Sequence, residues 1–211
     1  MQANSELKKI IKNRRNTKNF NNKNISNEDI NSLLDVAVWA PNHRNTEPWR
    51  FFVIKKDSEI KNKIAEGIIE IQNNINNLDL SEKQKNKIHE EVRNYPCLIF
   101  VFSLEDENEE ISVENYGATC CAIQNIQLMA TSLGLGVGWS TGKIAKINGI
   151  SEILGIEEQV KIVGVLTIGY SDKVKTKSIM NFLETLENED DVQHVYANLE
   201  IDNNFKDKIS T

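Results

Sequence analysis

The sequence predicts a β-sheet covered by helices, in the α/β or α+β class. Three observations carry this prediction. Stretches with apolar residues every three or four positions, typical of helices, alternate with short apolar runs that are typical of buried strands. Most of the expected strands are separated by a helix, which excludes an all-α bundle. The stretch 112–133 is apolar on more than one face, so we expect a buried helix at the centre of the fold.

The length and charge of the chain limit the classes of protein to which it can belong. At 211 residues it is one large domain or two very small ones, and we expect a single domain over residues 1–211. The net charge of −6 argues against nucleic acid as the main partner, because a phosphate backbone requires a basic face. A local basic cluster could still bind one small anion.

We expect neither a membrane span nor a disulfide framework. The first residues, Met1–Glu6, lack the apolar core of a signal peptide. The longest apolar stretch, 97–102, is far shorter than the roughly 20 residues that span a bilayer. The three cysteines are odd in number and contain no Cys-x-x-Cys pair, which predicts a reduced cytoplasmic protein.

The first quarter of the chain predicts two helices and a strand. The first helix ends in the basic run 12–15, and residues 16–22 are polar and typical of a loop. Ser26, with an acid three residues later, resembles a capping box that opens a second helix. That helix ends at Pro41, and 49–54 is typical of a buried strand.

Residues 58–94 predict a variable helical cover. Asp57 can cap a long helix that carries several isoleucines, and the Asn-rich tract 73–77 interrupts it. A strongly charged helix follows over 81–93. Because this region is less apolar than the rest, we expect it to contribute less to the core and to be mobile.

The second half of the chain predicts the rest of the sheet. We expect three further strands, over 96–102, 135–140 and 160–170. The acidic tract 105–110 is typical of a solvated turn, Gly134 ends the central helix, and 147–154 is a short helix. The acidic tail, 188–211, is compatible both with wrapping around a partner and with disorder.

The loop between Pro41 and Pro48 is the first candidate for a binding site. It contains Asn, His, Arg, Asn and Glu, which is more hydrogen-bonding capacity than a surface turn needs. The two prolines fix its connections to a helix and to a strand. A polar loop held by rigid elements is a common place for a binding site.

The glycine run 134–142 and the pair Arg14 and Arg15 each leave two interpretations open. The glycines follow a helix and open a strand, which excludes the dinucleotide fingerprint. They fit either a helix C-cap with close backbone packing or a flat ligand that passes near the backbone. The two arginines either complement the dipole of the first helix or bind an anion.

The residues do not suggest a metal site or a protein nucleophile. His43, His89 and His194 lack partners at metal-ligand spacing. Ser140 lacks the context of a nucleophile elbow, and Cys120 and Cys121 lie in an apolar helix, where a thiolate is disfavoured. We therefore assign no catalytic residue, and a bound cofactor would carry the chemistry of an enzyme.

Three stretches taken together resemble the nitroreductase-like family of FMN flavoproteins. RRNTKNF at 14–20 is similar to the family's RRSxRxF pattern, and APNHRNTEPWRF at 40–51 is similar to its APSxxNxQPWxF signature. GLGVGWSTG at 134–142, with KIVGVLTIGY at 161–170, is similar to two later blocks of the short-chain members. The resemblance implies an α+β fold with a central, mostly antiparallel sheet flanked by helices in an intertwined homodimer.

The resemblance also implies two FMN sites at the dimer interface, each built from both subunits. One subunit would contact the phosphate and ribityl chain and place a cation near N1/O2, through Arg14, Arg15, Asn16 and Lys18. It would also back the flavin rings and add phosphate charge, through Trp139, Ser140, Thr141 and Lys177. The other subunit would supply Trp39, His43 and Asn45. From the residues alone, Asn45 could equally serve to fix its loop.

Three of these positions depart from the family pattern. Asn16 stands where Ser is usual and retains hydrogen-bonding capacity. Trp39 stands where relatives carry Arg, so a stacking surface replaces a charge. Lys177 replaces a frequent Arg and loses the bidentate geometry for phosphate.

The activity implied by the resemblance is that of an FMN-dependent NAD(P)H oxidoreductase. A hydride from NADH or NADPH would pass to the flavin, which would then reduce a small-molecule acceptor such as a nitroaromatic or a quinone in the same cleft (ping-pong). Alternatives are a specialised relative such as a reductive dehalogenase, or a flavin-binding or sensing protein without steady turnover. A helical interaction protein with an acidic tail is a third interpretation.

Overall fold

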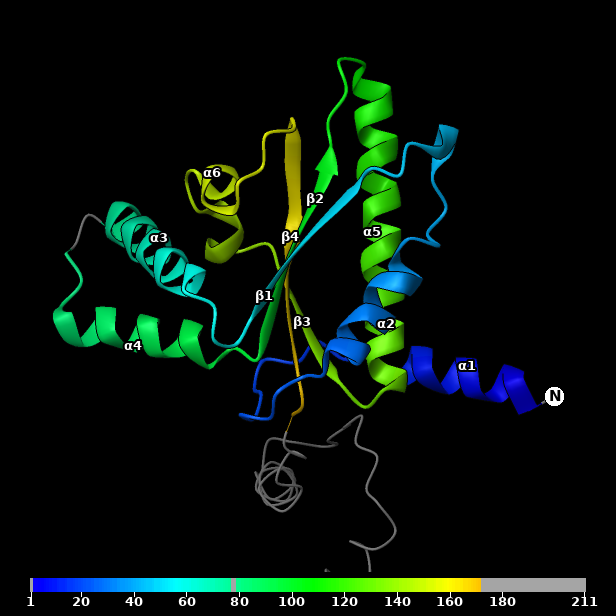
Figure 1. The fold of residues 1–211 in the computed structure, drawn as a ribbon, viewed down its shortest axis with the longest axis horizontal. Helices are drawn as coiled ribbons and strands as arrows, with labels where there is room; N and C mark the ends of the chain where they lie inside the picture. The colour runs from blue at the N-terminus through cyan, green and yellow to red at the C-terminus, as the bar shows by residue number, and fades with distance from the viewer. Residues whose placement is uncertain (1, 77–78, 172–211) are drawn as a thin grey trace, which may run out of the picture. The chain divides into compact units, whose positions relative to one another are not determined.

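The computed structural model describes residues 2–76 and 79–171 of the 211-residue chain (Figure 1). Its strands are β1 (Trp49–Lys55), β2 (Cys97–Leu104), β3 (Gly136–Ser140) and β4 (Val160–Gly169). Its helices are α1 (Gln2–Asn13), α2 (Asn27–Ala37), α3 (Ile60–Asn76), α4 (Glu82–Asn94), α5 (Glu109–Ser132) and α6 (Ile150–Leu154), with short 3-10 turns η1 (His43–Asn45) and η2 (Lys143–Lys146). Lys177 and the tail 188–211 lie outside the described residues.

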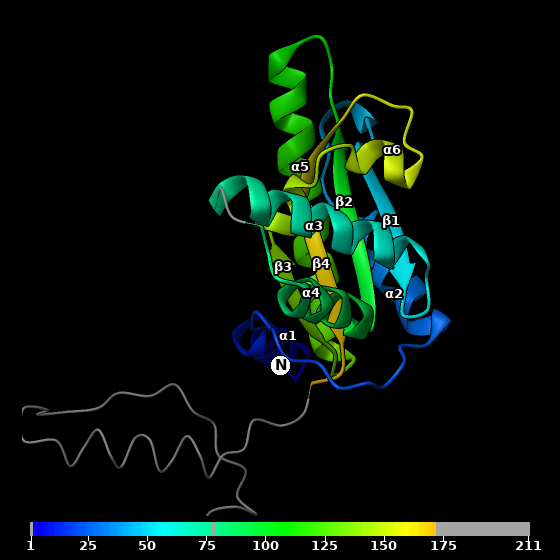
Figure 2. The same cartoon turned by 90° about the vertical axis from the view of Figure 1, so that its left-hand side faces the viewer.

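The four strands form one antiparallel sheet in the order β1-β2-β4-β3. In Figure 1, α2 and α5 lie on one side of this sheet, and α3, α4 and α6 lie on the other. Figure 2 shows α3 and α4 in front of the sheet from the second side. The predicted class, a mostly antiparallel α+β sheet flanked by helices, is confirmed.

Strand β2 contributes side chains to two separate cores because successive residues of a strand point to opposite faces. Cys97, Ile99 and Val101 pack on the side of α2 and α5. Leu98, Phe100 and Phe102 pack on the side of α3, α4 and α6. All six are at most 1% exposed, so the continuous apolar run reflects burial on both faces.

Helix α5 begins three residues earlier than its apolar pattern predicts. Asn108 is its N-cap, and the Asn108 side chain accepts a hydrogen bond from the backbone N–H of Glu110. Glu109 and Glu110 therefore belong to the helix rather than to a solvated turn. Acidic side chains are favourable there because the first turn carries the positive end of the helix dipole. At the other end Gly134 has φ +73, as expected for a residue that ends a helix.

Residues 58–94, expected to contribute less to the core than the rest, nevertheless supply buried side chains from both helices. Ile64, Ala65 and Val92 are at most 2% exposed and pack against the second face of the sheet. The isoleucines decide the structure here, since their helical spacing outweighs the polar residues between them. For the same reason α3 continues through the Asn-rich tract to Asn76 instead of stopping before it. The two helices do cover the sheet, as predicted.

The expected short helix over 147–154 begins later, at Ile150. Only Ile150–Leu154 is α-helical, and η2 precedes it. Gly149 separates them with φ +66, a left-handed conformation that interrupts a right-handed helix.

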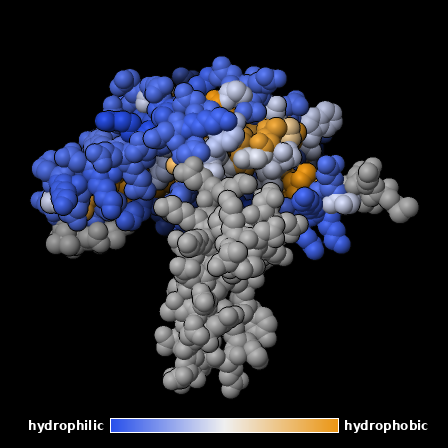
Figure 3. Space-filling model, turned by 90° about the horizontal axis from the view of Figure 1, so that it is seen from below, coloured by the Kyte–Doolittle hydropathy of each residue, from blue (hydrophilic) through white to orange (hydrophobic). Residues whose placement is uncertain are grey.

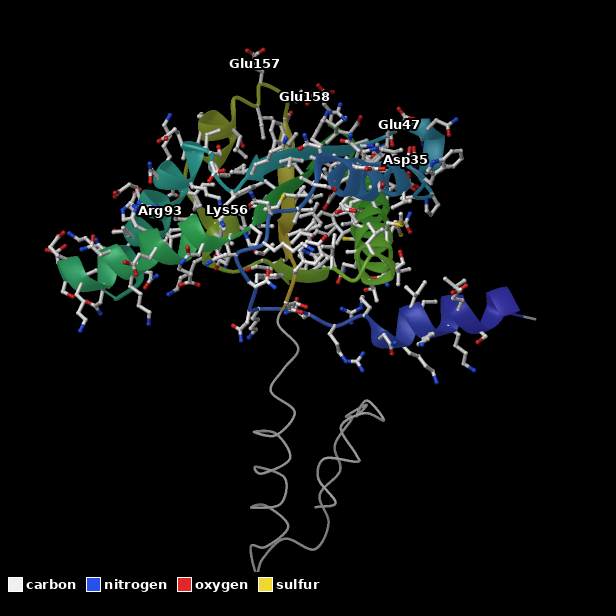
Figure 4. The ribbon with its side chains drawn as sticks, turned by 60° about the horizontal axis from the view of Figure 1, so that its bottom comes forward. Asp35, Glu47, Lys56, Arg93, Glu157 and Glu158 are labelled. Atoms are coloured by element: carbon white, nitrogen blue, oxygen red, sulfur yellow. The ribbon has the colours of Figure 1, made fainter. Side chains whose placement is uncertain are left out.

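An ion pair ties β1 to the turn before β4 at one end of the sheet. The Arg50 guanidinium donates to both carboxylate oxygens of Glu158, with Nε to Oε2 and Nη2 to Oε1 each at 2.8 Å. In Figure 4 the labelled Glu157 and Glu158 lie at the end of the molecule away from α1.

Candidate functional site

The segment after α1 runs alongside the edge strand β3. The Thr17 N–H donates to the Val137 carbonyl at 2.9 Å, and Asn16 forms a parallel bridge with Val137. The Asn16 side-chain oxygen accepts the Trp139 N–H, also at 2.9 Å. These bonds satisfy backbone groups on an edge that would otherwise be open, and they fix residues 16–18 beside β3.

The glycines of β3 allow this close approach. A side-chain carbon built at Gly136 would lie 2.7 Å from the Thr17 hydroxyl oxygen, and one at Gly138 would overlap the Thr17 carbonyl oxygen. Together with the cap at Gly134, this supports the packing interpretation of the glycine run. The glycines make room for residues 16–18 of the same chain.

A hollow of about 280 Å³ opens where this segment, β3, β4 and the end of α4 meet. It is lined by Asn16, Thr17, Lys18, Phe20, Glu91, Tyr95, Gly138, Trp139, Ser140 and Thr167. Four predicted site residues are thus together: Asn16, Lys18, Trp139 and Ser140. Thr141 directly follows β3 and is exposed.

The two arginines have different surroundings. Arg14 is half-buried and donates to the side-chain oxygen of Gln127 on α5 at 3.3 Å. Arg15 is exposed and donates to the carbonyls of Lys12 and Arg14 at the end of α1. Arg15 therefore matches the helix-end interpretation. Arg14 is held by α5 and lies two residues before Asn16, which lines the hollow. Neither arginine lines the hollow itself.

The Pro41–Pro48 loop lies at the other end of α5 from the hollow (Figure 1, light blue at upper right). His43 Nδ1 lies 2.8 Å from Glu114 Oε1, and the Thr46 hydroxyl donates to Asn115 Oδ1 at 2.8 Å. A single chain therefore does not bring His43 or Asn45 to the hollow.

The same loop has an unusual backbone. Arg44, Asn45 and Glu47 adopt φ values of +60, +51 and +44, which cost energy for residues other than glycine. The contacts to α5 and the Glu47 N–H bond to Asn42 Oδ1 hold this conformation. The positive φ of Asn45 agrees with a role in fixing the loop, and its contact with a second subunit's flavin stays a prediction.

Trp39 is 80% exposed and belongs to an apolar surface, not to the hollow. With residues of α1, α2 and α5 it lines a shallow depression of about 350 Å³, made by Leu7, Ile10, Val36, Trp39, Asn125, Leu128, Met129 and Ser132. Figure 3 shows apolar side chains gathered on the α1 side of the molecule. Large apolar surfaces of this kind mark interaction sites in soluble proteins.

Sequence reasoning missed the α4 wall of the hollow. Tyr95 donates its hydroxyl hydrogen to Glu91 Oε1 at 2.9 Å, and both side chains line the hollow. Burial, followed by the Glu91 charge, raises the pKa of the Tyr95 hydroxyl above its usual range. The spacing of Glu91 and Tyr95 predicts contact at a helix end. It does not predict that α4 docks beside β3.

Lys61 anchors this wall from beneath. Its ammonium group donates to the carbonyls of Arg93 and Tyr95, which are free at the end of α4, and the residue is 4% exposed. Burial lowers the pKa of Lys61 to about 8. The unfolded chain therefore holds more protons than the folded one between pH of about 8 and 10.5.

We expect Lys61 to make stability rise with pH across this window, because the charged form is penalised by burial. The free energy of unfolding of the wild type, minus that of Lys61→Met, should increase as pH rises from about 8 to 10.5. Urea unfolding of both proteins at pH 7.5 and 10 measures this difference, in which other titrating groups cancel. A difference that stays constant with pH would contradict the shifted pKa.

The chain thus combines an antiparallel α+β fold with a hollow beside the glycine-containing edge strand β3. Residues 11–170 match the Nitroreductase family. The chain belongs to this family. It is 30% identical to "Putative NAD(P)H nitroreductase YfhC" of Bacillus subtilis over 169 residues. The aligned region covers 80% of this chain and 86% of that protein.

Solved structures share the fold. The nitroreductase-like family protein from Bacillus cereus has a TM-score of 0.66 and 30% identity, over 79% of this chain and 86% of that one. A nitroreductase with bound FMN from Desulfitobacterium hafniense has a TM-score of 0.61 and 24% identity, over 81% of this chain and 91% of that one. No helix within 2–76 or 79–171 is long and apolar enough to cross a membrane. The described part of the chain contains no cluster of three or more metal-ligating side chains.

Proposed function

We propose that the protein is an FMN-dependent NAD(P)H oxidoreductase. The observation that carries this proposal is the hollow in which Asn16 and Lys18 are fixed beside the backbone of β3. Family membership supports it, as do the NAD(P)H nitroreductase name of the Bacillus subtilis relative and the FMN in the Desulfitobacterium structure.

The side chains around the hollow fit a flat, anionic cofactor. Lys18 supplies positive charge at the hollow, and Asn16 and Ser140 supply polar groups at the β3 edge. Arg14 does not line the hollow and lies two residues before Asn16 in the chain. The indole Nε1 of Trp139 is buried against Gly164 of β4 and has no hydrogen-bond partner among the described residues. Bound FMN would supply hydride transfer between a reduced nicotinamide and an acceptor.

Each residue then has a separate task. Arg14, oriented by Gln127, would hold the phosphate, and Asn16 would orient the ribityl side. Lys18 would favour the reduced cofactor, since a positive charge stabilises negative charge that develops at the N1/O2 edge. Trp139 and Thr141 would back the rings, and Lys177 would add charge for the phosphate.

We further propose that two copies complete each site. A hollow of about 280 Å³ is below the roughly 300–1,000 Å³ of sites that enclose a ligand of this size. Trp39, His43 and Asn45 face other surroundings in their own chain, and Trp39 belongs to an exposed apolar surface. A partner that covers this surface would bring those residues to the second chain's hollow.

The dimer should persist on dilution, because obligate interfaces bury on the order of 2,000–5,000 Å². Light scattering across a hundredfold dilution, with the FMN content of each species measured, checks this expectation. A monomer that retains tightly bound FMN would rule out the shared site.

An absorbance spectrum before and after anaerobic addition of NADH or NADPH tests the activity. We expect a flavin spectrum that bleaches with one or both nucleotides and recovers with a nitroaromatic or a quinone. Bound FMN that neither nucleotide bleaches would favour a flavin-binding or sensing protein. Recovery only with a halogenated aromatic would favour a reductive dehalogenase. Protein that takes up no added FMN would favour an interaction protein.

A further inference from the structure

The α4 wall gives the hollow an acidic side chain that the flavin assignment does not use. Among the described residues that line the hollow, Glu91 is the one anion and Lys18 the one cation. They come from different elements, the last turns of α4 and the segment beside β3. A negative and a positive group thus border the same small space.

The exposed side chain of Glu91 is held by one hydrogen bond, and the end of its helix is held by a second residue. Tyr95 donates its hydroxyl hydrogen to the Glu91 carboxylate at 2.9 Å, one helical turn further along the chain. Beneath them, buried Lys61 donates to the carbonyls of Arg93 and Tyr95 and holds the end of α4. The Tyr95 hydroxyl is protonated at neutral pH, as tyrosine ordinarily is, and so remains a donor; burial, followed by the Glu91 charge, raises its pKa further.

We propose that Glu91, held by Tyr95, sets the reduction potential of the cofactor bound in this hollow. The inference rests on the proposed function. Reduction adds negative charge to a flavin, and a nearby carboxylate disfavours that charge whereas Lys18 favours it. Glu91 thus lowers the midpoint potential and makes the bound cofactor a stronger reductant toward its acceptor.

The electrostatic effect has a definite sign in two variants. Glu91→Gln retains an oxygen for the Tyr95 hydroxyl but removes the charge, so the reduced cofactor should bind about threefold to tenfold more tightly relative to the oxidised one. A tenfold change corresponds to about 30 mV for a two-electron couple. Tyr95→Phe keeps the charge and removes the hydrogen bond that disperses it, so the potential should become more negative.

The matched control is Glu90→Gln. Glu90 is the neighbouring residue on α4, is exposed and does not line the hollow, so the change in net charge is the same. Its midpoint potential should equal that of the wild type. A wall with only a structural role would weaken binding of both redox forms together and leave the potential of every variant unchanged.

The experiment is a spectroscopic redox titration of the full-length protein with bound FMN, with dissociation constants for oxidised FMN measured in parallel. A positive shift in Glu91→Gln, a negative shift in Tyr95→Phe and no shift in Glu90→Gln support the inference. An unchanged potential in Glu91→Gln, or an equal shift in Glu90→Gln, overturns it while the proposed function stands. Wild-type protein that binds no FMN overturns both.

Discussion

Replacing Arg14 by alanine should raise the dissociation constant for FMN by about tenfold to hundredfold. One hydrogen bond to a charged group contributes about 1.5–3 kcal/mol, and Arg14 is held in place by Gln127 on the buried helix α5. Flavin fluorescence during titration measures the affinity. Unfolding of the FMN-free variant should be measured too, because the substitution also removes a donor from Gln127.

Two further variants separate charge from geometry at this position. Arg14→Lys keeps the charge and loses the planar fork, so we expect a smaller loss of affinity. Arg15→Ala should have the smallest effect, because the Arg15 guanidinium caps carbonyls of α1. Wild-type affinity in Arg14→Ala would remove Arg14 from the site.

Replacing Gly138 by alanine should cost about 1–3 kcal/mol of stability and abolish tight FMN binding. The added methyl group would overlap the Thr17 carbonyl oxygen, which is backbone and cannot rotate away. Residues 16–18 would be displaced from β3, and the 2.9 Å bond between Asn16 and the Trp139 N–H would break. Urea unfolding and FMN titration report the two effects.

Gly136→Ala provides the matched comparison on the same strand. Its new methyl group meets the Thr17 side chain, which can rotate in part, so both losses should be smaller than for Gly138→Ala. If both variants lose stability and FMN affinity to the same extent, the cause is the replacement of a strand glycine in general and not the contact with the Thr17 carbonyl oxygen. Gly138→Ala with wild-type stability and affinity would contradict the packing explanation.

The elements that the sequence predicts well are those whose burial is continuous. The run 97–102 is buried on both faces of its strand, whereas α5 buries one face, with Ala118, Ala122 and Ile126, and leaves Val113 66% exposed. In α3 the polar residues separate isoleucines that are buried at helical spacing, and the helix runs on through the Asn-rich tract that was expected to interrupt it. Composition was a poorer guide there than periodicity.

The candidate site was predictable where it is continuous in sequence. Asn16 and Lys18 share one motif, and Trp139 and Ser140 share another. Glu91 and Tyr95 were not predictable, because their place depends on how α4 docks and on the buried contact from Lys61. The loop residues His43 and Asn45 stay a prediction, since their proposed target belongs to a second copy.

The position of β2 in the sheet has a consequence for how the chain folds. Its partner β1 is already synthesised when Cys97–Leu104 appears, but its other partner, β4, begins only at Val160. During that interval a strand that is apolar on both faces has one unpaired edge, which is a site for self-association. Helix α5 is the next element made and packs against one face of β2. Early docking of α5 would therefore cover one apolar face of β2, while its open edge stays exposed until β4 pairs with it.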